Sequence, residues 1–398
     1  MASVIKIYAL FLGSALLMFG GGLQGLLLSV RGAEEGFSLL ALGLIGTGWS
    51  VGFVAGSIAV PLIVRKVGHI RAFSVMAAIG TVTILLNLLM VNDVSWILLR
   101  ALSGFCFAGA AMIVESWLNE VADNRSRGTI FSVYTTINMA ASTVGQLAMS
   151  VTGTTGYIPF VIGAMLAITA MFMRRHMHET ESFTEANKNP VKRESSIRGL
   201  MRYPREIAIV VGLTAGGTAA FYTFTTYMQT FVRQTAGFSD ITTTYVIAGS
   251  LIFAAILQPI YGAISDRIGR KPLLIFFGVA GTLLTVPLLT TLAGTKSPWI
   301  AFLLISGAWV FVAGYTSINA VVKAELFPTS IRATGVAVPY ALTVSIFGGT
   351  APAIALFFKQ QGHEQWFYYY LAGVIFVSLL VYATMRDTKH QSAMHRHD

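Results

Sequence analysis

The sequence predicts an all-α polytopic membrane protein, and three observations lead to that fold class. The chain has 398 residues, of which 55% are hydrophobic and only 11% are charged, whereas about 25% of residues are charged in an average soluble domain. The mean hydropathy is +0.70. Its apolar runs are continuous rather than alternating, which favours helices over a membrane β-barrel. This composition excludes a disordered chain, a secreted disulfide scaffold and an ordinary soluble enzyme.

Twelve transmembrane helices are expected, because each span needs about 20 residues and the loops are short. The longest polar stretch, residues 174–205, divides the spans six and six. We therefore expect an N-terminal six-helix bundle over 1–173, a cytoplasmic linker over 174–205, and a C-terminal bundle with a short cytoplasmic tail over 206–398. The expected spans are 7–29, 40–63, 72–91, 95–119, 128–151, 157–173, 206–231, 241–265, 272–292, 299–322, 333–357 and 366–385.

The distribution of positive charge predicts the orientation of these spans. With the N-terminus in the cytoplasm, 22 of the 27 Lys and Arg residues lie on the cytoplasmic side, four lie outside, and Arg100 lies within a span. Cytoplasmic loops carry an excess of Lys and Arg, so we expect a multi-pass membrane protein with both termini in the cytoplasm. The net charge of +10 then reports topology, and no nucleic-acid partner is expected.

Several kinds of chemistry are absent from the sequence. The single cysteine, Cys106, lies in an apolar run, so no intrachain disulfide is possible. No phosphate-binding loop, metal-ligand cluster or nucleophile motif is present, so we expect no cofactor, no metal site and no catalytic residue. Glycines at 48, 52 and 56 form a ladder with the spacing that lets membrane helices approach closely.

Two matching stretches indicate an internal repeat. Glu120 and Arg127 stand seven residues apart after the fourth span of the first half, and Glu325 and Arg332 do so after the fourth span of the second half. A glycine follows each stretch, at positions 128 and 335. Parallel six-helix repeats are the sequence mark of a major-facilitator transporter.

The loop between the eighth and ninth spans is more specific. It reads Gly262-Ala-Ile-Ser-Asp266-Arg267-Ile-Gly269-Arg270-Lys271 and resembles the signature loop of the major facilitators at every defining position. The resemblance implies two six-helix bundles around a central cavity, alternating access, and a gating latch. The latch residues would be Asp266, Arg267, Gly269, Arg270, Glu120, Arg127, Glu325 and Arg332.

One contact of this latch can be predicted in detail. A helix N-terminus favours negative charge, so we expect Asp266 to meet the first turn of the span that begins at Gly128. The equivalent loop of the first half departs from the signature, because Arg65 takes the place of the acid and Pro61 that of the first glycine. The latch of that half should therefore differ.

The two halves resemble different branches of the superfamily. Residues from about 171 to 386 resemble the metabolite:proton symporters, and within them the group of alpha-ketoglutarate permeases; the likeness is carried by residues 212–229, 258–262 and 323–332. Residues 19–25, 69–71 and 114–120 instead resemble a bacterial branch of efflux-like substrate range. The chain thus resembles an engineered hybrid or a natural recombinant of two ancestries.

The likeness of the second half implies proton-coupled symport of a small organic anion, for example a dicarboxylate such as 2-oxoglutarate. That of the first half leaves proton-coupled efflux of apolar compounds open, and a hybrid that folds without transport is a third alternative. The expected partners are the substrate, protons and the lipid bilayer, with the protein acting as a monomer.

Charges inside a bilayer cost several kcal/mol, so the few within the spans are candidate functional groups. Arg100 and Glu115 lie 15 residues apart in the fourth span, which places them on one helix face. Arg100 carries a fixed charge that suits a carboxylate, and Glu115 is the candidate proton-coupling residue. The alternative is that each side chain reaches the membrane interface.

Polar side chains in other spans complete the candidate site. They could give hydrogen bonds to an anionic substrate, although each could instead be a packing contact between helices. The candidates for substrate binding besides Arg100 are Gln24, Tyr222, Thr226, Gln229, Tyr315, Asn319 and Tyr340. The three of the seventh span are expected on one helix face. Tyr315 and Asn319 are expected to share a face of the tenth span with Lys323, and Tyr340 could join them from the eleventh span.

Overall fold

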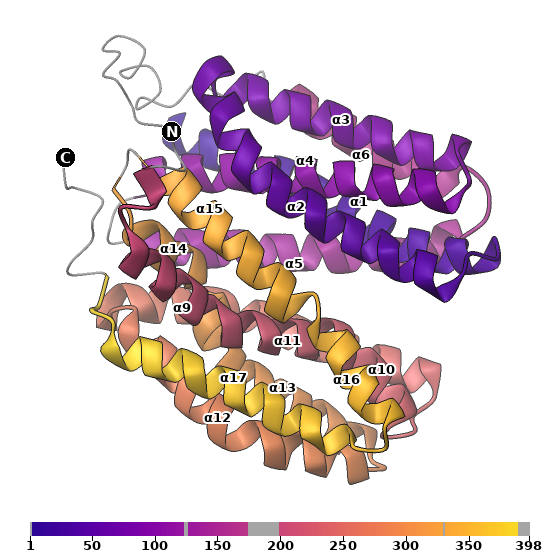
Figure 1. Ribbon diagram of the computed structural model, residues 1–398, viewed down its shortest axis with the longest axis vertical. Helices are drawn as coiled ribbons and strands as arrows, with labels where there is room; N and C mark the ends of the chain where they lie inside the picture. Colours follow the sequence, from indigo (N-terminus) through magenta and orange to yellow (C-terminus); the bar gives the residue numbers. More distant parts are fainter. Residues whose placement is uncertain (1, 123–125, 174–198, 329–330, 389–398) are drawn as a thin grey trace. The chain divides into compact units, whose positions relative to one another are not determined.

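The computed structural model describes residues 2–122, 126–173, 199–328 and 331–388, and all of its regular elements within these ranges are helical (Figure 1). The first half contains α1 (Ala2–Glu34), α2 (Leu39–Val67), α3 (His69–Leu89), α4 (Asp93–Val121), α5 (Arg127–Thr152) and α6 (Ile158–Met173). The second half contains α9 (Pro204–Tyr222), η2 (Thr223–Tyr227), α10 (Met228–Gln234), α11 (Asp240–Ile268), α12 (Lys271–Gly294), α13 (Pro298–Thr316), α14 (Asn319–Glu325), α15 (Arg332–Thr343), η3 (Val344–Gly348), α16 (Ala351–Gln360) and α17 (Glu364–Thr384).

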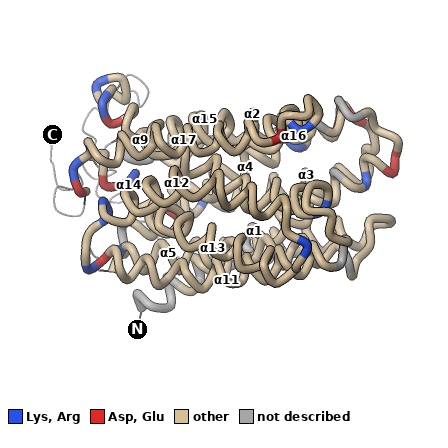
Figure 2. Tube along the Cα trace, turned by 90° about the horizontal axis from the view of Figure 1, so that it is seen from below, with Lys and Arg blue, Asp and Glu red and all other residues tan. Residues whose placement is uncertain are grey.

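The predicted all-α membrane fold is confirmed, and each expected span has a helical counterpart. Within the described residues, ten helical segments are long and apolar enough to cross a bilayer. The two remaining spans correspond to α5, which is more polar, and to α6, whose apolar part Ile158–Thr169 is shorter. Charged residues gather near the helix ends, and the middle parts of the helices are largely free of them (Figure 2).

Two spans of the second half contain a π-helical turn, and a third is interrupted. The segment η2 separates α9 from α10, and η3 separates α15 from α16. The tenth span bends between α13 and α14, where Ser317 and Ile318 form a turn. Such π-turns inside α-helices are frequent at functional sites.

The chain divides into two compact units. The first comprises Met1–Ala122 and Ile137–Leu200, and the second Asp123–Thr136 and Met201–Asp398. The first ten residues of α5 therefore belong to the unit that holds the C-terminal helices. The linker predicted at 174–205 falls largely on residues 174–198, which lie outside the described ranges, so its role remains a prediction.

Glycines bring the helices of the first unit into close contact. The ladder on α2 packs against the backbone of α4: a Cβ atom at Gly48 would lie 2.8 Å from the carbonyl oxygen of Ile97, and one at Gly52 would overlap that of Ala101. A Cβ at Gly22 of α1 would likewise overlap the backbone of Ser142 in α5. The predicted packing role of the ladder is confirmed, because its glycines leave no space for a side chain.

Helices α9 and α17 of the second unit are joined by buried hydroxyl groups. Ser378 accepts a hydrogen bond from the amide of Gly216 at 2.8 Å and donates to the carbonyl of Gly212 at 2.5 Å. One turn further on α17, the hydroxyl of Tyr382 donates to the carbonyl of Leu213 at 2.8 Å. These bonds join α9, which continues into η2, to α17.

Candidate functional site

Arg100 lies in the first third of α4 (Asp93–Val121) and contacts α1 and α2. Its Nη1 donates to Oε1 of Gln24 at 3.3 Å, and its guanidinium carbon lies 5.9 Å from the centre of the Trp49 ring. Arg100 is half-buried and Gln24 is only 5% exposed. Among the described residues, no carboxylate forms an ion pair with Arg100. The structure thus joins two of the predicted substrate-binding residues around one guanidinium.

Two hydroxyl groups extend this contact and were missed from the sequence. Nε2 of Gln24 donates to Oγ of Ser103 at 3.2 Å, and Ser103 is bonded to Oγ1 of Thr83 at 2.9 Å. Thr83 donates in turn to the carbonyl of Gly80 at 2.8 Å. The available signal was that Ser103 stands three residues after Arg100, and therefore on the same helix face. We call Arg100, Gln24, Ser103 and Thr83 the Arg100 network.

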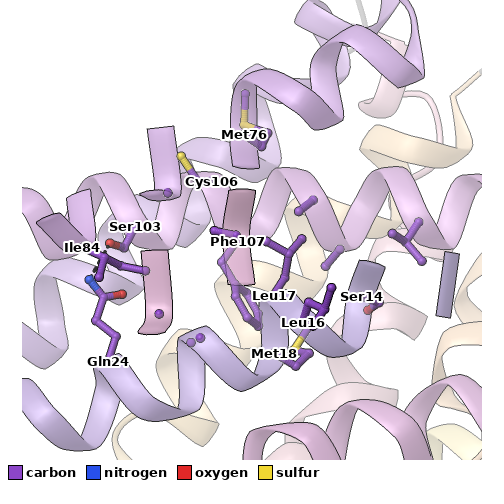
Figure 3. A pocket seen from close by; sticks show the side chains of 18 residues that line it. Ser14, Leu16, Leu17, Met18, Gln24, Met76, Ile84, Ser103, Cys106 and Phe107 are labelled. Atoms are coloured by element: carbon purple, nitrogen blue, oxygen red, sulfur yellow. Dashed lines mark hydrogen bonds between the residues drawn. The ribbon is translucent and has the colours of Figure 1, made fainter. Parts of the chain in front are cut away.

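A cavity of about 60 Å³ lies inside the first unit, between α1, α3, α4 and α6. Figure 3 shows Gln24 and Ser103 at one end of it and Ser14 at the other, with mostly apolar side chains between them. Cys106 lines the cavity and is 5% exposed. The Arg100 network thus borders a small space of the size that holds a few water molecules.

Glu115 lies four turns beyond Arg100 on α4 and is half-buried. Its backbone carbonyl accepts a hydrogen bond from Nδ2 of Asn119 at 2.9 Å. The next residue, Ser116, is 3.2 Å from Nε2 of His69, whose ring lies 5.8 Å from that of Trp117. The segments 69–71 and 114–120, which share one resemblance in the sequence, therefore contact each other.

The three candidates of the seventh span have different surroundings. Tyr222 is half-buried beside Gly348 of η3, whereas Thr226 and Gln229 are exposed. Their expected common face assumed a regular α-helix, but η2 lies between Tyr222 and Gln229 and changes the rotation per residue. Substrate binding by these residues remains a prediction.

The candidates of the tenth and eleventh spans also separate into two kinds. Tyr315 is 3% exposed and packs against Gly217 and the Phe277 ring, which favours the packing alternative for it. Asn319 donates to the carbonyl of Thr316 at 2.9 Å, where α13 ends. Lys323 and Tyr340 do meet as expected, since the ammonium lies 3.3 Å from the centre of the Tyr340 ring.

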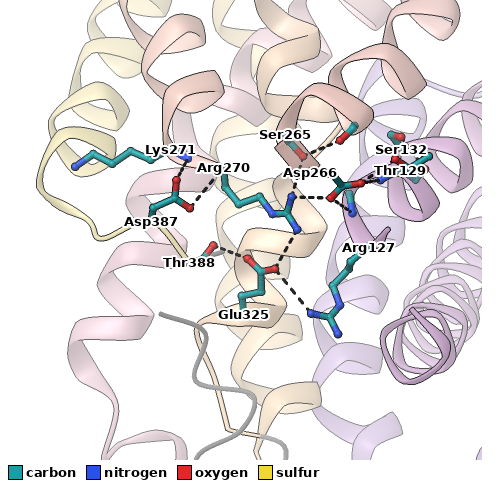
Figure 4. Close-up of polar contacts among 12 residues, drawn as sticks. Arg127, Thr129, Ser132, Ser265, Asp266, Arg270, Lys271, Glu325, Asp387 and Thr388 are labelled. Carbon is teal, nitrogen blue, oxygen red and sulfur yellow. Dashed lines mark hydrogen bonds and ion pairs between the residues drawn. The ribbon is translucent and has the colours of Figure 1, made fainter. Parts of the chain in front are cut away.

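The contact predicted for Asp266 is present at the start of α5 (Figure 4). Its carboxylate accepts hydrogen bonds from the backbone amides of Gly128 at 2.9 Å and Thr129 at 2.8 Å, and from the Thr129 hydroxyl at 2.8 Å. A Cβ at Gly128 would lie 2.5 Å from Asp266 Oδ1, and one at Gly262 would overlap Ser132. Both glycines are therefore required for this close approach.

A buried ionic cluster continues from Asp266. Nη1 of Arg270 is 2.8 Å from Oδ1 of Asp266, and its Nη2 is 3.4 Å from Oε1 of Glu325. Arg127 lies 3.9 Å from the same Glu325 oxygen. The side chains of Arg270 and Glu325 are fully buried, whereas Arg267 is exposed. The side chains of Glu120 and Arg332 lie outside the described part of the structure.

Asp387 and Thr388 follow α17 and bind this cluster and the start of α12. We call these two residues the tail clasp. Asp387 accepts hydrogen bonds from the amides of Arg270 at 3.2 Å and Lys271 at 3.3 Å, at the start of α12. Thr388 donates to Oε2 of Glu325 at 2.5 Å.

The turn before α12 uses Gly269 at φ +99°, and the turn before α3 uses Gly68 at φ +87°. The two halves thus share the turn although Arg65 replaces the acid.

Within the described residues, no group of three or more His, Cys, Asp and Glu side chains could hold a metal ion. The candidate residues thus offer Arg100 with neutral polar partners in the first unit and a buried ionic cluster in the second.

Comparison with known proteins gives a consistent picture. The sequence profile of the Major Facilitator Superfamily matches residues 10–338 and 239–396. The alpha-ketoglutarate permease of Escherichia coli (strain K12) is 40% identical over 224 residues, which are 56% of this chain and 51% of the permease. The match therefore spans about half the length of that relative. The citrate-proton symporter of Salmonella typhi is 28% identical over 349 residues, or 81% of this chain and 79% of the symporter.

Solved structures agree on the fold. The structure of the proton:xylose symporter XylE superposes with a TM-score of 0.72 and covers 98% of each chain, at 16% sequence identity. At this identity the likeness concerns the fold alone.

Proposed function

The chain belongs to the Major Facilitator Superfamily, and from this premise we propose that it is a proton-coupled secondary transporter of a small organic anion. A multi-pass membrane transporter of this superfamily is not an enzyme. The proposed orientation places both termini in the cytoplasm of a bacterial inner membrane, on the strength of the Lys and Arg distribution. Substrate and protons would be exchanged by alternating access of one monomer.

The observation that carries the proposal is the state of Arg100. A guanidinium inside a membrane span is costly and therefore functional by default. Within the described residues it has a neutral amide and an aromatic ring as partners rather than a carboxylate. A guanidinium binds a carboxylate through two parallel hydrogen bonds, so Arg100 is suited to take a substrate carboxylate.

The relatives support a carboxylate-bearing substrate. The names of the permease and of the citrate symporter refer to a dicarboxylate and a tricarboxylate, respectively. We propose 2-oxoglutarate as the first substrate to test, since the permease has the higher identity. The alternatives are proton-coupled efflux of apolar compounds, and a hybrid of two ancestries that inserts without transporting.

Counterflow in proteoliposomes tests the proposal. Vesicles loaded with unlabelled 2-oxoglutarate should accumulate labelled 2-oxoglutarate, and external citrate should compete to a measurable extent. Vesicles with Arg100→Ala protein serve as the control for leakage. Efflux of an apolar dye without counterflow of any carboxylate would favour the efflux alternative, and correctly inserted protein that moves neither would indicate a non-transporting hybrid.

Proton coupling can be tested at Glu115. If Glu115 carries the proton, Glu115→Gln should abolish uptake driven by a pH gradient, while counterflow, which needs no net proton movement, survives. The measurement compares both assays in the same vesicles. Glu206, an acidic residue in the first turn of α9, offers a control as Glu206→Gln, which should leave both assays unchanged. Equal loss of both activities in Glu115→Gln would contradict the coupling role.

The conformational balance can be tested at the latch. Hydrogen bonds between Asp266 and the first turn of α5 contribute about 0.3–2 kcal/mol, which shifts a two-state population severalfold. Asp266→Asn should therefore favour the inward-open state, whereas Arg65→Ala should change it little. Double electron–electron resonance between labels on loops 4–5 and 10–11 measures the shift. If Asp266→Asn gave the distance distribution of the parent, or if Arg65→Ala changed it more, the prediction that the two latch loops contribute unequally would be wrong.

A further inference from the structure

The hydrogen bonds of the Arg100 network have one consistent direction. At one end, the carbonyl of Gly80 can only accept, so Thr83 gives its single hydroxyl proton to it. Ser103 must then donate in its bond with Thr83, because the proton of Thr83 is already used. Having given away its own proton, Ser103 can only accept from Gln24. The amide of Gln24 therefore turns its NH₂ group to Ser103 and its oxygen to Arg100.

The other end of the network requires the same direction. A guanidinium donates hydrogen bonds and accepts none, so Arg100 needs the oxygen of Gln24 facing it, as observed at 3.3 Å. The network is also shielded: Thr83 is 0% exposed, Ser103 7% and Gln24 5%. A group that loses its partner here is therefore a buried polar group, and such a group costs about 1–3 kcal/mol unless it finds a new partner.

We infer that Ser103 and Thr83 are positioning residues for the substrate, acting on Arg100 through the amide of Gln24. The inference rests on the proposed function, because it assumes that Arg100 binds the carboxylate. Gln24 accordingly aims the guanidinium rather than discriminating substrates itself. Three helices contribute to this aim, since Gln24 lies on α1, Thr83 on α3, and Ser103 with Arg100 on α4.

The consequence of breaking the network follows from the donor count. In Thr83→Val, Ser103 loses the acceptor of its proton, so its hydroxyl can rotate and no longer holds the Gln24 amide in one position. The guanidinium then loses the fixed acceptor that aims it. In Ser103→Ala the amide loses the partner that fixes its orientation. Both changes weaken carboxylate binding without touching the substrate.

Transport kinetics of 2-oxoglutarate in proteoliposomes test this inference. Ser103→Ala and Thr83→Val should raise KM about tenfold and leave Vmax within twofold. Ser103→Thr and Thr83→Ser, which keep the hydroxyl groups, should restore the parental KM. The matched control is Thr81→Val: Thr81 is also buried on α3, but it donates only to the carbonyl of Ala77 in its own helix, so KM should not change.

A double substitution tests whether the effect passes through Gln24. In a Gln24→Ala background, Ser103→Ala should add nothing, because residues that act through one partner are not additive. A further increase in KM, a loss of Vmax alone, or failure of the conservative variants to restore KM would overturn the inference.

A measurement that needs no transport separates failure of this inference from failure of the proposed function. Phenylglyoxal modifies free guanidinium groups, and mass spectrometry of the peptide containing Arg100 gives its rate of modification. Ser103→Ala and Thr83→Val should raise this rate severalfold, and Thr81→Val should not. If the parent moves no carboxylate but the rates follow this pattern, the network stands and the proposed substrate is wrong; unchanged rates would refute the network.

Discussion

Arg100→Ala should abolish uptake of organic anions, the largest functional effect that we expect of any single substitution. The change removes the one Lys or Arg that the charge distribution places inside a span, and with it the bidentate partner of a carboxylate. Arg100→Lys should be strongly impaired as well, because an ammonium keeps the charge but not the forked geometry. Uptake of labelled 2-oxoglutarate at matched protein amounts in the membrane is the measurement.

The control for Arg100 is Arg233, which lies in the last turn of α10. Arg233→Ala removes the same charge at the end of a span and should retain uptake. Parental uptake by Arg100→Ala at normal expression would refute the binding role, and equal loss in both variants would point to a general effect of charge on insertion.

Gly52→Ala should give the largest loss of stability for the smallest change in volume. The added Cβ would overlap the carbonyl oxygen of Ala101, so α2 and α4 would have to move apart along the whole ladder. Overpacking of this kind costs about 1–3 kcal/mol. Gly46→Ala on the same helix is the matched control, because a Cβ there meets nothing within 4 Å, and it should cost nothing.

The single cysteine provides the measurement for this pair. Cys106 lies on α4 and is 5% exposed, so a thiol-reactive fluorophore reports unfolding of the first unit as the detergent-solubilised protein is heated. Gly52→Ala should lower the transition temperature and Gly46→Ala should not. Equal transition temperatures for Gly52→Ala and the parent would show that the helices can separate at little cost.

The spans could be predicted from the sequence because a bilayer requires long apolar helices, and hydropathy reports this directly. The contact of Asp266 with the first turn of α5 could be predicted as well, since the signature loop and the helix dipole both indicate it. These predictions depend on local sequence and on general electrostatics. Neither requires knowledge of how side chains from distant spans pack.

The uncharged residues of the Arg100 network could not be predicted, because their role depends on how side chains from distant spans pack. Neither Ser103 nor Thr83 carries a charge, and the only sequence signal for Ser103 is its spacing of three residues from Arg100. Their role becomes visible only when the packing places Ser103 between Gln24 and Thr83. The same limit applies to η2, because hydrophobic periodicity assumes 3.6 residues per turn and cannot reveal a π-turn between Tyr222 and Gln229. The burial of Arg270 against Glu325 likewise depends on two residues that are 55 positions apart in the sequence.

The tail clasp determines where the chain can be truncated or fused to a tag. A chain shortened to end at Thr384 would lose the carboxylate that accepts the first amides of α12, and the buried Glu325 would lose the hydroxyl of Thr388. An affinity tag or fluorescent reporter should therefore be joined beyond residue 388. A chain with a reporter fused directly after α17 should fold in lower yield in the membrane. The residues lost in such a fusion would appear dispensable from hydropathy alone, because they follow the last span.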